Sequence, residues 1–315
     1  MEISEFWQPF EYEITSFDEL VDVIQKVMRF STSKNRTFAW RGQVDANWAL
    51  HSSIYRRACL SKGRVLTEKD ITDVETKIIT DLHRWGLHSS SETGRLSILN
   101  QLAMLQHYGS PTRLIDITFN AWVAVWFAVE EKWAQGVRLA DDKDARLFAI
   151  DVSGRLINEM KELRKWEDSL TRPWKPENEF CQQTWTTNVY AWKPSNINGR
   201  IAAQNGGFLF GGVPATRKPD GKNSMQIPKT GDTKNAGCWR IGEVRKAICV
   251  AARPHKFDSK VGRTVESDAL FTFRIKAKAI HEIRDCLDKM FGYRHSTIYP
   301  DYTGFAQFGT RYLKS

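Results

Sequence analysis

The segment that most constrains the fold is an apolar run at residues 121–133. Asn120 precedes this run and is a typical helix-capping residue. Apolar side chains then occupy nearly every side of the predicted helix: Trp122, Val123, Val125, Trp126, Phe127 and Val129. A helix that is apolar all round would expose a broad apolar surface unless other elements covered it. We therefore expect residues 121–133 to form a buried helix.

Hydrophobic periodicity elsewhere predicts both helices and strands. Amphipathic helices are expected over residues 16–28, 67–86, 96–107 and 280–291. Strands are expected over residues 38–43, 113–117, 146–152, 246–252 and 270–276. Because the strands lack regular β-α-β spacing, we expect an α+β protein with a mixed, mostly antiparallel sheet core and flanking helices. Residues 1–315 are expected to form a single domain, with a long inserted loop at residues 211–245.

The chain is basic, with 46 Lys and Arg residues against 37 Asp and Glu residues, which gives a formal net charge of +9. Such a charge attracts polyanions including RNA, DNA and nucleotide phosphates, although general solubility is a simpler explanation. The five cysteines form no C-x-x-C pair and no zinc-site spacing, so we expect a reduced, cytoplasmic protein without a metal. We expect neither a secretory signal nor a membrane span, because the first residues are acidic and no apolar run is long enough.

Residues 38–43, Phe-Ala-Trp-Arg-Gly-Gln, predict an apolar strand that ends by presenting an arginine. The guanidinium of Arg41 matches phosphate oxygens in a bidentate geometry, and Gly42 permits another group to come close. Gln43 adds a second polar group. The structural alternative is an ion pair at the strand end, but we interpret these three residues as an anion-binding site.

Residues 106–118 gather polar side chains in an otherwise apolar neighbourhood. The ring of Tyr108 suits stacking on a flat heterocycle, or packing as a core tyrosine. Thr112, Arg113 and Asp116 enter the predicted strand. Because an unpaired buried charge is strongly destabilising, Arg113 and Asp116 must either pair with each other or bind a ligand.

Two further segments carry candidate site residues. Residues 198–208 are rich in glycine and contain Arg200 and Gln204, but they lack the spacing of a dinucleotide-binding fingerprint or a P-loop. Gln204 could orient a ribose hydroxyl or an acceptor group, or act as a structural amide. Residues 164–200 interleave tryptophans, including Trp174 and Trp185, with Arg and Lys, which suits base stacking beside phosphate neutralisation. The alternative is that these rings pack over the sheet, which is the commoner role of tryptophan.

Motifs of other enzyme classes are absent from the sequence. It contains no G-x-S-x-G elbow, no H-E-x-x-H helix and no zinc-deaminase pattern. Asp141, Asp142 and Asp144 raise the possibility of a metal-dependent nuclease, but their polar surroundings favour a solvated loop.

The order of these motifs resembles that of the FRG domain family, which is named for an aromatic-Arg-Gly motif. The resemblance extends over residues 38–305, and Trp40 replaces the phenylalanine of the family name. It is carried by residues 40–43, by Trp48, Leu50, Ser53 and Arg56, by residues 106–116, by residues 200–206 and by residues 299–301.

The strand with Arg41 also resembles the first conserved strand of ADP-ribosyltransferases, which implies an ADP-ribosyltransferase-like fold and NAD as co-substrate. By this resemblance, Arg41, Tyr108 and Gln204 are the catalytic candidates. Arg41 would hold the NAD phosphates or ribose, Tyr108 would pack the nicotinamide, and Gln204 would steady the ribose and direct the acceptor. The NAD-binding candidates are Arg41, Gly42, Gln43, Thr112, Arg113 and Asp116. No acidic residue stands clearly in the position of a catalytic glutamate.

We expect nucleic acid as the acceptor, RNA rather than DNA, with Trp174, Trp185 and Arg200 contacting it. By resemblance alone, such an activity suits a toxin or a phage-defence effector with an antitoxin partner. Two alternatives stay open at this point: a non-catalytic module that binds nucleic acid or nucleotides, and a nuclease toxin.

Overall fold

The computed structural model describes residues 2–90, 94–159, 166–167, 169–175, 185–194, 199–215, 227–230, 237–257 and 269–313. Large parts of the predicted loop at 211–245 and of the Trp-rich stretch at 164–200 therefore lie outside the described residues. Among the residues described, no helix combines the length and apolar character needed to cross a membrane.

The fold is built around a central sheet with the strand order β1-β12-β8-β2-β5-β10-β9. Strand β11 also pairs with β12. The strands of the sheet are β1 (Glu11–Ile14), β2 (Phe38–Gln43), β5 (Ile115–Thr118), β8 (Ala145–Asp151), β9 (Val189–Trp192), β10 (Gly206–Gly211), β11 (Arg253–Pro254) and β12 (Ala269–Ile275). The β1–β12 and β11–β12 pairs are parallel, and the other pairs are antiparallel. The predicted α+β fold with a mixed, mostly antiparallel sheet is confirmed.

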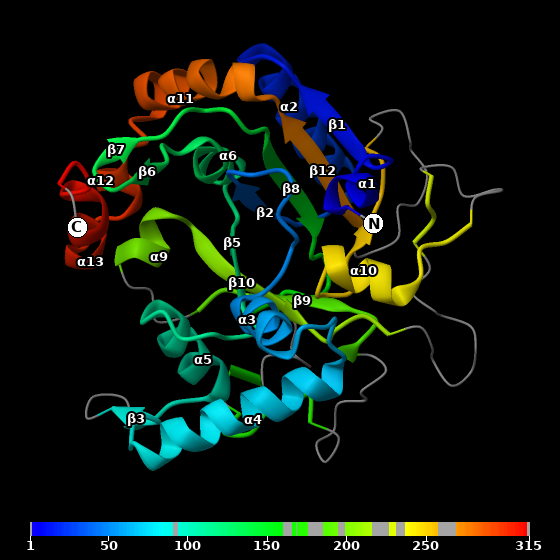
Figure 1. Cartoon of the computed structure of the whole chain (residues 1–315), viewed down its shortest axis with the longest axis vertical. Helices are drawn as coiled ribbons and strands as arrows, with labels where there is room; N and C mark the ends of the chain where they lie inside the picture. The colour runs from blue at the N-terminus through cyan, green and yellow to red at the C-terminus, as the bar shows by residue number, and fades with distance from the viewer. Residues whose placement is uncertain are drawn as a thin grey trace.

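Helices surround this sheet (Figure 1). They are α1 (Ile3–Trp7), α2 (Phe17–Lys34), α3 (Ser53–Lys62), α4 (Glu68–Arg84), α5 (Ile98–His107), α6 (Ala121–Val129), α9 (Gly199–Ala203), α10 (Ile241–Ala247), α11 (Ala277–Phe291), α12 (His295–Ile298), α13 (Tyr302–Gly304) and the π-helix η1 (Phe305–Gly309). Two small hairpins pair β3 (Ser89–Ser90) with β4 (Gly94–Arg95) and β6 (Trp133–Ala134) with β7 (Val137–Arg138).

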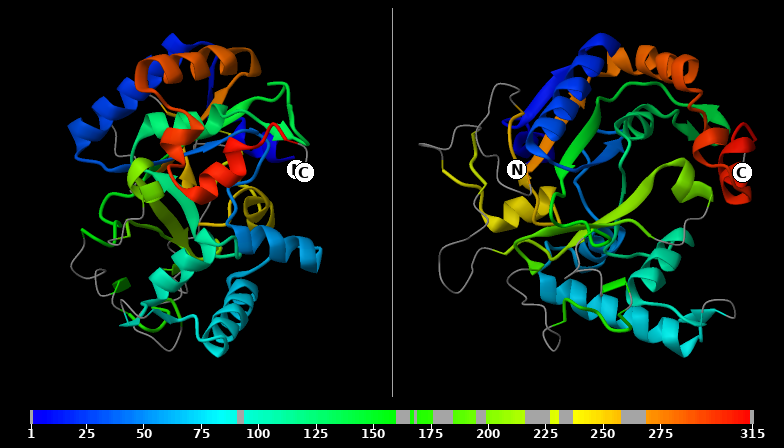
Figure 2. Two further views of the ribbon diagram at one scale, coloured as in Figure 1. Left: turned by 90° about the vertical axis from the view of Figure 1, so that its left-hand side faces the viewer. Right: turned by 180° about the vertical axis from the view of Figure 1, so that it is seen from behind.

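Helix α6 is buried, as its sequence predicts. The Asn120 side chain caps it by accepting a hydrogen bond from the backbone N–H of Trp122. The helix ends at Val129, before the predicted end at residue 133. It packs in one apolar cluster with α2, α11 and strands β2, β8 and β12. Helices α2 and α11 run along one end of the molecule, opposite α4 (Figure 2).

Gly42 is required by the contact between β2 and α6. A Cβ atom on Gly42 would lie 1.9 Å from the backbone oxygen of Ala124 and 2.6 Å from the nitrogen of Ala128. Those distances are far below van der Waals contact, so only glycine allows the strand to lie directly on the helix. The sequence predicts this glycine for the close approach of a ligand, and the structure adds a second reason, the close approach of a helix.

Two other apolar clusters complete the core. One joins α1, α3 and α10 to the sheet, and the other joins α4 and α5 to β9 and β10. The strand predicted at residues 246–252 is wrong, because residues 241–247 form helix α10 and Ile248 makes only an isolated bridge to Leu50. The other predicted strands and amphipathic helices are present, with shifted ends.

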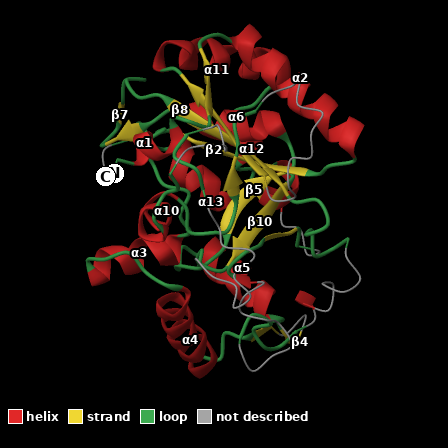
Figure 3. Cartoon of the chain, turned by 90° about the vertical axis from the view of Figure 1, so that its right-hand side faces the viewer, coloured by secondary structure: helices red, strands yellow, loops and turns green. Residues whose placement is uncertain are grey.

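Strands β2 and β5 are neighbours near the centre of the sheet (Figure 3). The sheet has a seam between them, where few residues pair. Strand β2 pairs with β8 over six register positions, from Phe38 opposite Asp151 to Gln43 opposite Arg146. By contrast, β2 and β5 share a single register pair, Trp40 opposite Thr118. The strand that carries Arg41 therefore has full backbone pairing on one side, with β8, and almost none on the other, with β5.

Candidate functional site

A cavity of about 1290 Å³ lies at this seam. Six residues singled out from the sequence line it: Arg41, Gly42, Gln43, Asp116, Arg200 and Gln204. They come from β2, β5, α9 and the turn that follows α9. Aromatic rings also line the cavity, namely Trp40, Trp48, Phe127, Phe208 and Tyr299. The fold therefore brings together three motifs that lie far apart in the chain.

Arg41 lines the cavity and bridges the seam. One guanidinium nitrogen donates a hydrogen bond to the backbone oxygen of Asp116 at 2.5 Å. The Nε atom of Arg41 is buried and has no hydrogen-bond partner within the described part of the chain. Burial lowers the pKa of Arg41 and the nearby Asp116 opposes this, but an arginine stays charged at neutral pH. The site thus contains a cation with donor capacity left for a ligand.

Asp116 is exposed in the cavity and is held by a short chain of polar contacts. Its Oδ1 accepts a hydrogen bond from Gln106 Nε2 at 2.7 Å. The hydroxyl of Thr112 in turn donates to Gln106 Oε1. Thr112 is itself buried and does not line the cavity. The predicted direct contact of Thr112 with a ligand is therefore replaced by an indirect role in orienting Asp116.

Gln204 and Arg200 connect α9 to the C-terminal segment. Gln204 Nε2 donates to the backbone oxygen of Ile298 at 3.0 Å. Arg200 forms a bidentate ion pair with Asp301, at 2.9 and 2.8 Å, and this pairing lowers the pKa of Asp301. The Arg200 guanidinium also lies over the ring of Tyr299, 5.0 Å from its centroid. These contacts explain why residues 200–204 and 299–301 occur together as motifs.

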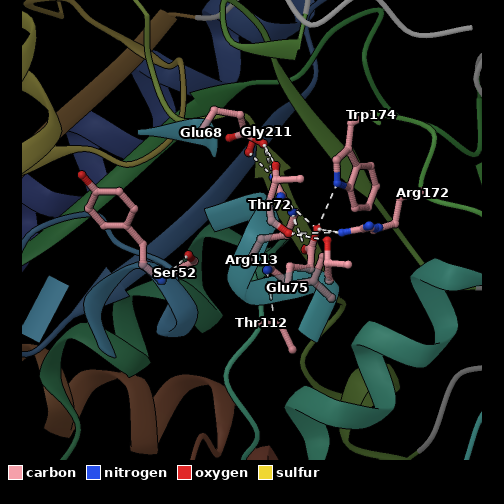
Figure 4. A network of polar contacts seen from close by, with 12 residues as sticks. Ser52, Glu68, Thr72, Glu75, Thr112, Arg113, Arg172, Trp174 and Gly211 are labelled. Atoms are coloured by element: carbon pink, nitrogen blue, oxygen red, sulfur yellow. Dashed lines mark hydrogen bonds and ion pairs between the residues drawn. The ribbon is translucent and has the colours of Figure 1, made fainter. Parts of the chain in front are cut away.

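Arg113 belongs to a buried ion-pair network and does not line the cavity (Figure 4). It donates to Glu75 at 2.6 and 2.9 Å and to Glu68 at 3.2 Å. Only 3% of Arg113 is exposed. Arg113 does not make the predicted pair with Asp116, and its charged partners are Glu75 and Glu68. Because two glutamates from α4 satisfy its charge, the role of Arg113 is to attach β5 to that helix.

Trp174 and Trp185 are part of the same network. Their rings stack on each other with centroids 4.9 Å apart, and the guanidinium of Arg113 lies over both. The indole N–H of Trp174 donates to Glu75, and that of Trp185 donates to Glu68. Both side chains are almost completely buried. They have no free face for a nucleic-acid base, so the predicted stacking role does not fit this structure.

Tyr108 lies outside the cavity, at the end of α5, and 76% of it is exposed. Its ring contacts the neighbouring His107 edge-on. Tyr299 is the tyrosine that lines the cavity, stacked on Phe308 with centroids 4.4 Å apart. The C-terminal segment, and not α5, therefore supplies a tyrosine to the lining of this cavity.

Glu130 is a site residue that sequence reasoning missed. It directly follows α6 and lines the cavity, and its Oε2 is buried without a hydrogen-bond partner among the described residues. Burial raises the pKa of Glu130 to about 7, against a smaller opposing effect of Arg311. The sequence did indicate that this glutamate is unusual, because a carboxylate at the C-terminus of a helix interacts unfavourably with the helix dipole.

Two aspartates of the acidic run at residues 141–144 form ion pairs within the protein. Asp141 pairs with Arg284 at 2.8 Å, and Asp144 pairs with Arg274 and Lys276 at 2.7 and 2.8 Å. Within the described ranges, no group of three or more His, Cys, Asp or Glu residues is arranged to hold a metal ion. These aspartates therefore have a structural function in the fold.

Fold and site together define an α+β protein with a ligand-sized cavity at the seam of its central sheet. Residues 36–136, about a third of the chain, match the model of the FRG domain. The matched region contains Arg41, Asp116 and Glu130, whereas Arg200, Gln204 and Tyr299 lie beyond it. No curated protein and no solved structure matches this chain.

Proposed function

We propose that the chain is an NAD-dependent ADP-ribosyltransferase and that NAD binds in the cavity at the seam. The observation that carries the proposal is Arg41, a cation in the cavity with a buried Nε that no described residue satisfies. Unpaired buried donors are unfavourable, and a pyrophosphate oxygen would satisfy this one.

The cavity suits a dinucleotide in size and lining. Its volume of about 1290 Å³ exceeds the roughly 300–1,000 Å³ of sites for drug-sized ligands. Aromatic rings at several positions offer flat surfaces for an adenine or a nicotinamide ring. Arg41 lines the cavity from β2, near the centre of the sheet, and a pyrophosphate bound there would join the two halves of NAD.

The chemistry follows from the bond that breaks. The C1′–N bond of the nicotinamide riboside is cleaved, its electron pair leaves with nicotinamide, and positive charge develops on the ribose. Groups that interact more strongly with that charged state than with bound NAD accelerate the reaction. Asp116 and Glu130 supply negative charge to the cavity, and Gln204 supplies an amide for the ribose hydroxyls.

Nucleic acid is the acceptor class that we retain, on the strength of the +9 charge, and RNA stays ahead of DNA as an expectation only. Trp174 and Trp185 give this choice no support, because they are buried. A role as a toxin or phage-defence effector, with an antitoxin partner, is likewise an expectation from family resemblance.

The experiment uses NAD labelled in the adenylate half and follows both nicotinamide release and label transfer. The purified protein is incubated with separate RNA, single-stranded DNA and protein pools. Release of nicotinamide with label in one pool supports the proposal and identifies the acceptor class. Binding of NAD without nicotinamide release would instead favour a non-catalytic nucleotide-binding module. Cleavage of nucleic acid that depends on a divalent metal and not on NAD would favour a nuclease.

A further inference from the structure

A second cavity of about 1160 Å³ lies next to the first, among α6, α11 and the C-terminal helices. Exposed aromatic side chains line it, including Tyr302 and Phe305, which are 95% and 64% exposed. Phe308 and Trp126 also line it. None of these residues lines the cavity at the seam. Large aromatic side chains are usually buried, so a group of exposed rings that line a cavity indicates a binding surface.

Glu130 and Tyr299 are the two residues that line both cavities. Glu130 therefore stands at the junction, with the Arg41 cavity on one side and the aromatic cavity on the other. A group in the second cavity and a ligand beside Arg41 in the first can therefore both approach this carboxylate. That position is the one a base must occupy between two reactants.

The surroundings of Glu130 compensate its charge only in part. His295 Nε2 lies 3.9 Å from Glu130 Oε2, which is too far for a hydrogen bond. Burial and the charge of Arg311 lower the pKa of His295 to about 4, so this histidine is neutral at pH 7. Arg311 itself pairs with Glu131 at 2.6 Å, and Arg284 pairs with Asp141. The nearby cations are thus engaged by other carboxylates.

We propose that the second cavity admits the acceptor and that Glu130 is the base that takes its proton. The ligand class is a group with an exchangeable N–H or O–H on a flat, unsaturated framework that the aromatic lining can hold. This inference rests on the proposed transferase function. It adds a second binding site and assigns a catalytic residue.

The proposed step is balanced without any further reactant. The acceptor nitrogen or oxygen forms a bond to ribose C1′, and the C1′–N bond to nicotinamide breaks with its electron pair. The acceptor proton passes to the Glu130 carboxylate and is later released to water. A base with a pKa close to the working pH is suited to this transfer, and the pKa of Glu130 is about 7.

The first test compares Glu130→Gln with wild type in single-turnover transfer of labelled ADP-ribose to the pool that wild type modifies. We expect a fall of roughly 100- to 10,000-fold, the range for loss of a general base, with NAD binding by calorimetry unchanged. The wild-type rate should rise with pH up to about 7 and then level off, and this rise should vanish in the variant. The control is Glu282→Gln, an exposed carboxylate on α11 that lines neither cavity.

The second test fills the acceptor cavity without touching Glu130. Ser296 is exposed and lines only the second cavity, so Ser296→Trp should fold normally. We expect transfer to the modified pool to fall at least tenfold, while hydrolysis of NAD by water continues. The matched control Lys289→Trp adds the same ring on an exposed position of α11 outside both cavities.

The outcomes separate the two proposals. If wild type neither binds NAD nor releases nicotinamide, the transferase function is wrong and this inference fails with it. If wild type transfers ADP-ribose but Glu130→Gln keeps the wild-type rate and pH profile, Glu130 is not the base. If Ser296→Trp transfers label as fast as Lys289→Trp, the acceptor does not enter through the second cavity.

Discussion

The guanidinium of Arg41 donates a hydrogen bond to the backbone oxygen of Asp116, across the seam where β2 and β5 share one register pair. This contact replaces part of the backbone pairing that the sheet lacks there. Arg41 also lines the cavity. A ligand that binds the guanidinium would therefore compete with the hydrogen bond that links β2 to β5.

The first prediction concerns Arg41→Lys. Lysine keeps the charge but loses the planar fork, so NAD affinity should fall by roughly 1–3 kcal/mol, the range for a charge-assisted hydrogen bond. Isothermal titration calorimetry measures this change. The control is Arg57→Lys, an exposed arginine outside the cavity. Equal affinities for wild type and Arg41→Lys would remove Arg41 from the NAD site.

The second prediction concerns Gln204→Ala. If the amide acts on the charged ribose, the variant should bind NAD nearly as well as wild type but react more slowly in a single turnover. The change also removes the hydrogen bond to Ile298, so thermal unfolding must be recorded for the same sample. A wild-type rate in a fully folded variant would place the catalytic amide elsewhere.

The third prediction concerns Gly42→Ala. The added Cβ would lie 1.9 Å from the backbone oxygen of Ala124, so β2 and α6 must separate. We expect a loss of stability of roughly 1–3 kcal/mol or more, as for other overpacked cores. Urea unfolding measures it. The same change at Gly242, where a Cβ meets nothing within 4 Å, should not destabilise the protein.

The fourth prediction compares two tryptophans. Trp174 is 2% exposed and packs on Trp185 and Arg113, so Trp174→Ala should lower stability by about 3–5 kcal/mol. Trp48 is 52% exposed and lines the cavity, so Trp48→Ala should leave stability nearly unchanged and weaken ligand binding. Melting temperatures of both variants measure the change in stability, and NAD titrations measure the change in binding. A stable Trp174→Ala protein with impaired RNA binding would revive the stacking role.

The fifth prediction concerns the pH dependence of stability at Glu130. Its pKa is about 7 in the folded protein against an ordinary value of 4.5, so the folded state holds more protons between these values. Stability must then fall as pH rises through this window. Glu130→Gln removes the cost of burying the charge, so the variant should exceed wild type by about 1–3 kcal/mol at pH 8 and match it at pH 4.

Urea midpoints at pH 4, 6 and 8 measure this effect. Glu282→Gln should show no pH-dependent gain, because that side chain is exposed. A constant difference between Glu130→Gln and wild type at all three pH values would mean that the carboxylate does not titrate in this window.

Local patterns predicted much of the fold. The all-round apolar run before Glu130, the capping residues and the alternation in residues 270–276 identified α6, several amphipathic helices and β12. These features depend on side chains a few positions apart, and a helix or strand repeats them over its own length. The prediction at residues 246–252 failed because a short apolar run fits a helix end as well as a strand.

Contacts between distant segments decided the site. Arg113 could have met a nucleotide or a carboxylate, and only the folded chain places Glu75, 38 residues away, within 2.6 Å of it. The same network hides Trp174 and turns a predicted stacking surface into core.

The sequence alone determined that α6 is buried and that Arg41 lies on a short strand, because both depend on local periodicity. The tertiary structure alone decided that Glu130 lies between two cavities. A carboxylate after a helix usually faces water, and its burial here depends on Tyr299, Arg311 and other groups that approach from remote parts of the chain. Burial and charge pairing are properties of the space around a side chain, which local sequence does not specify.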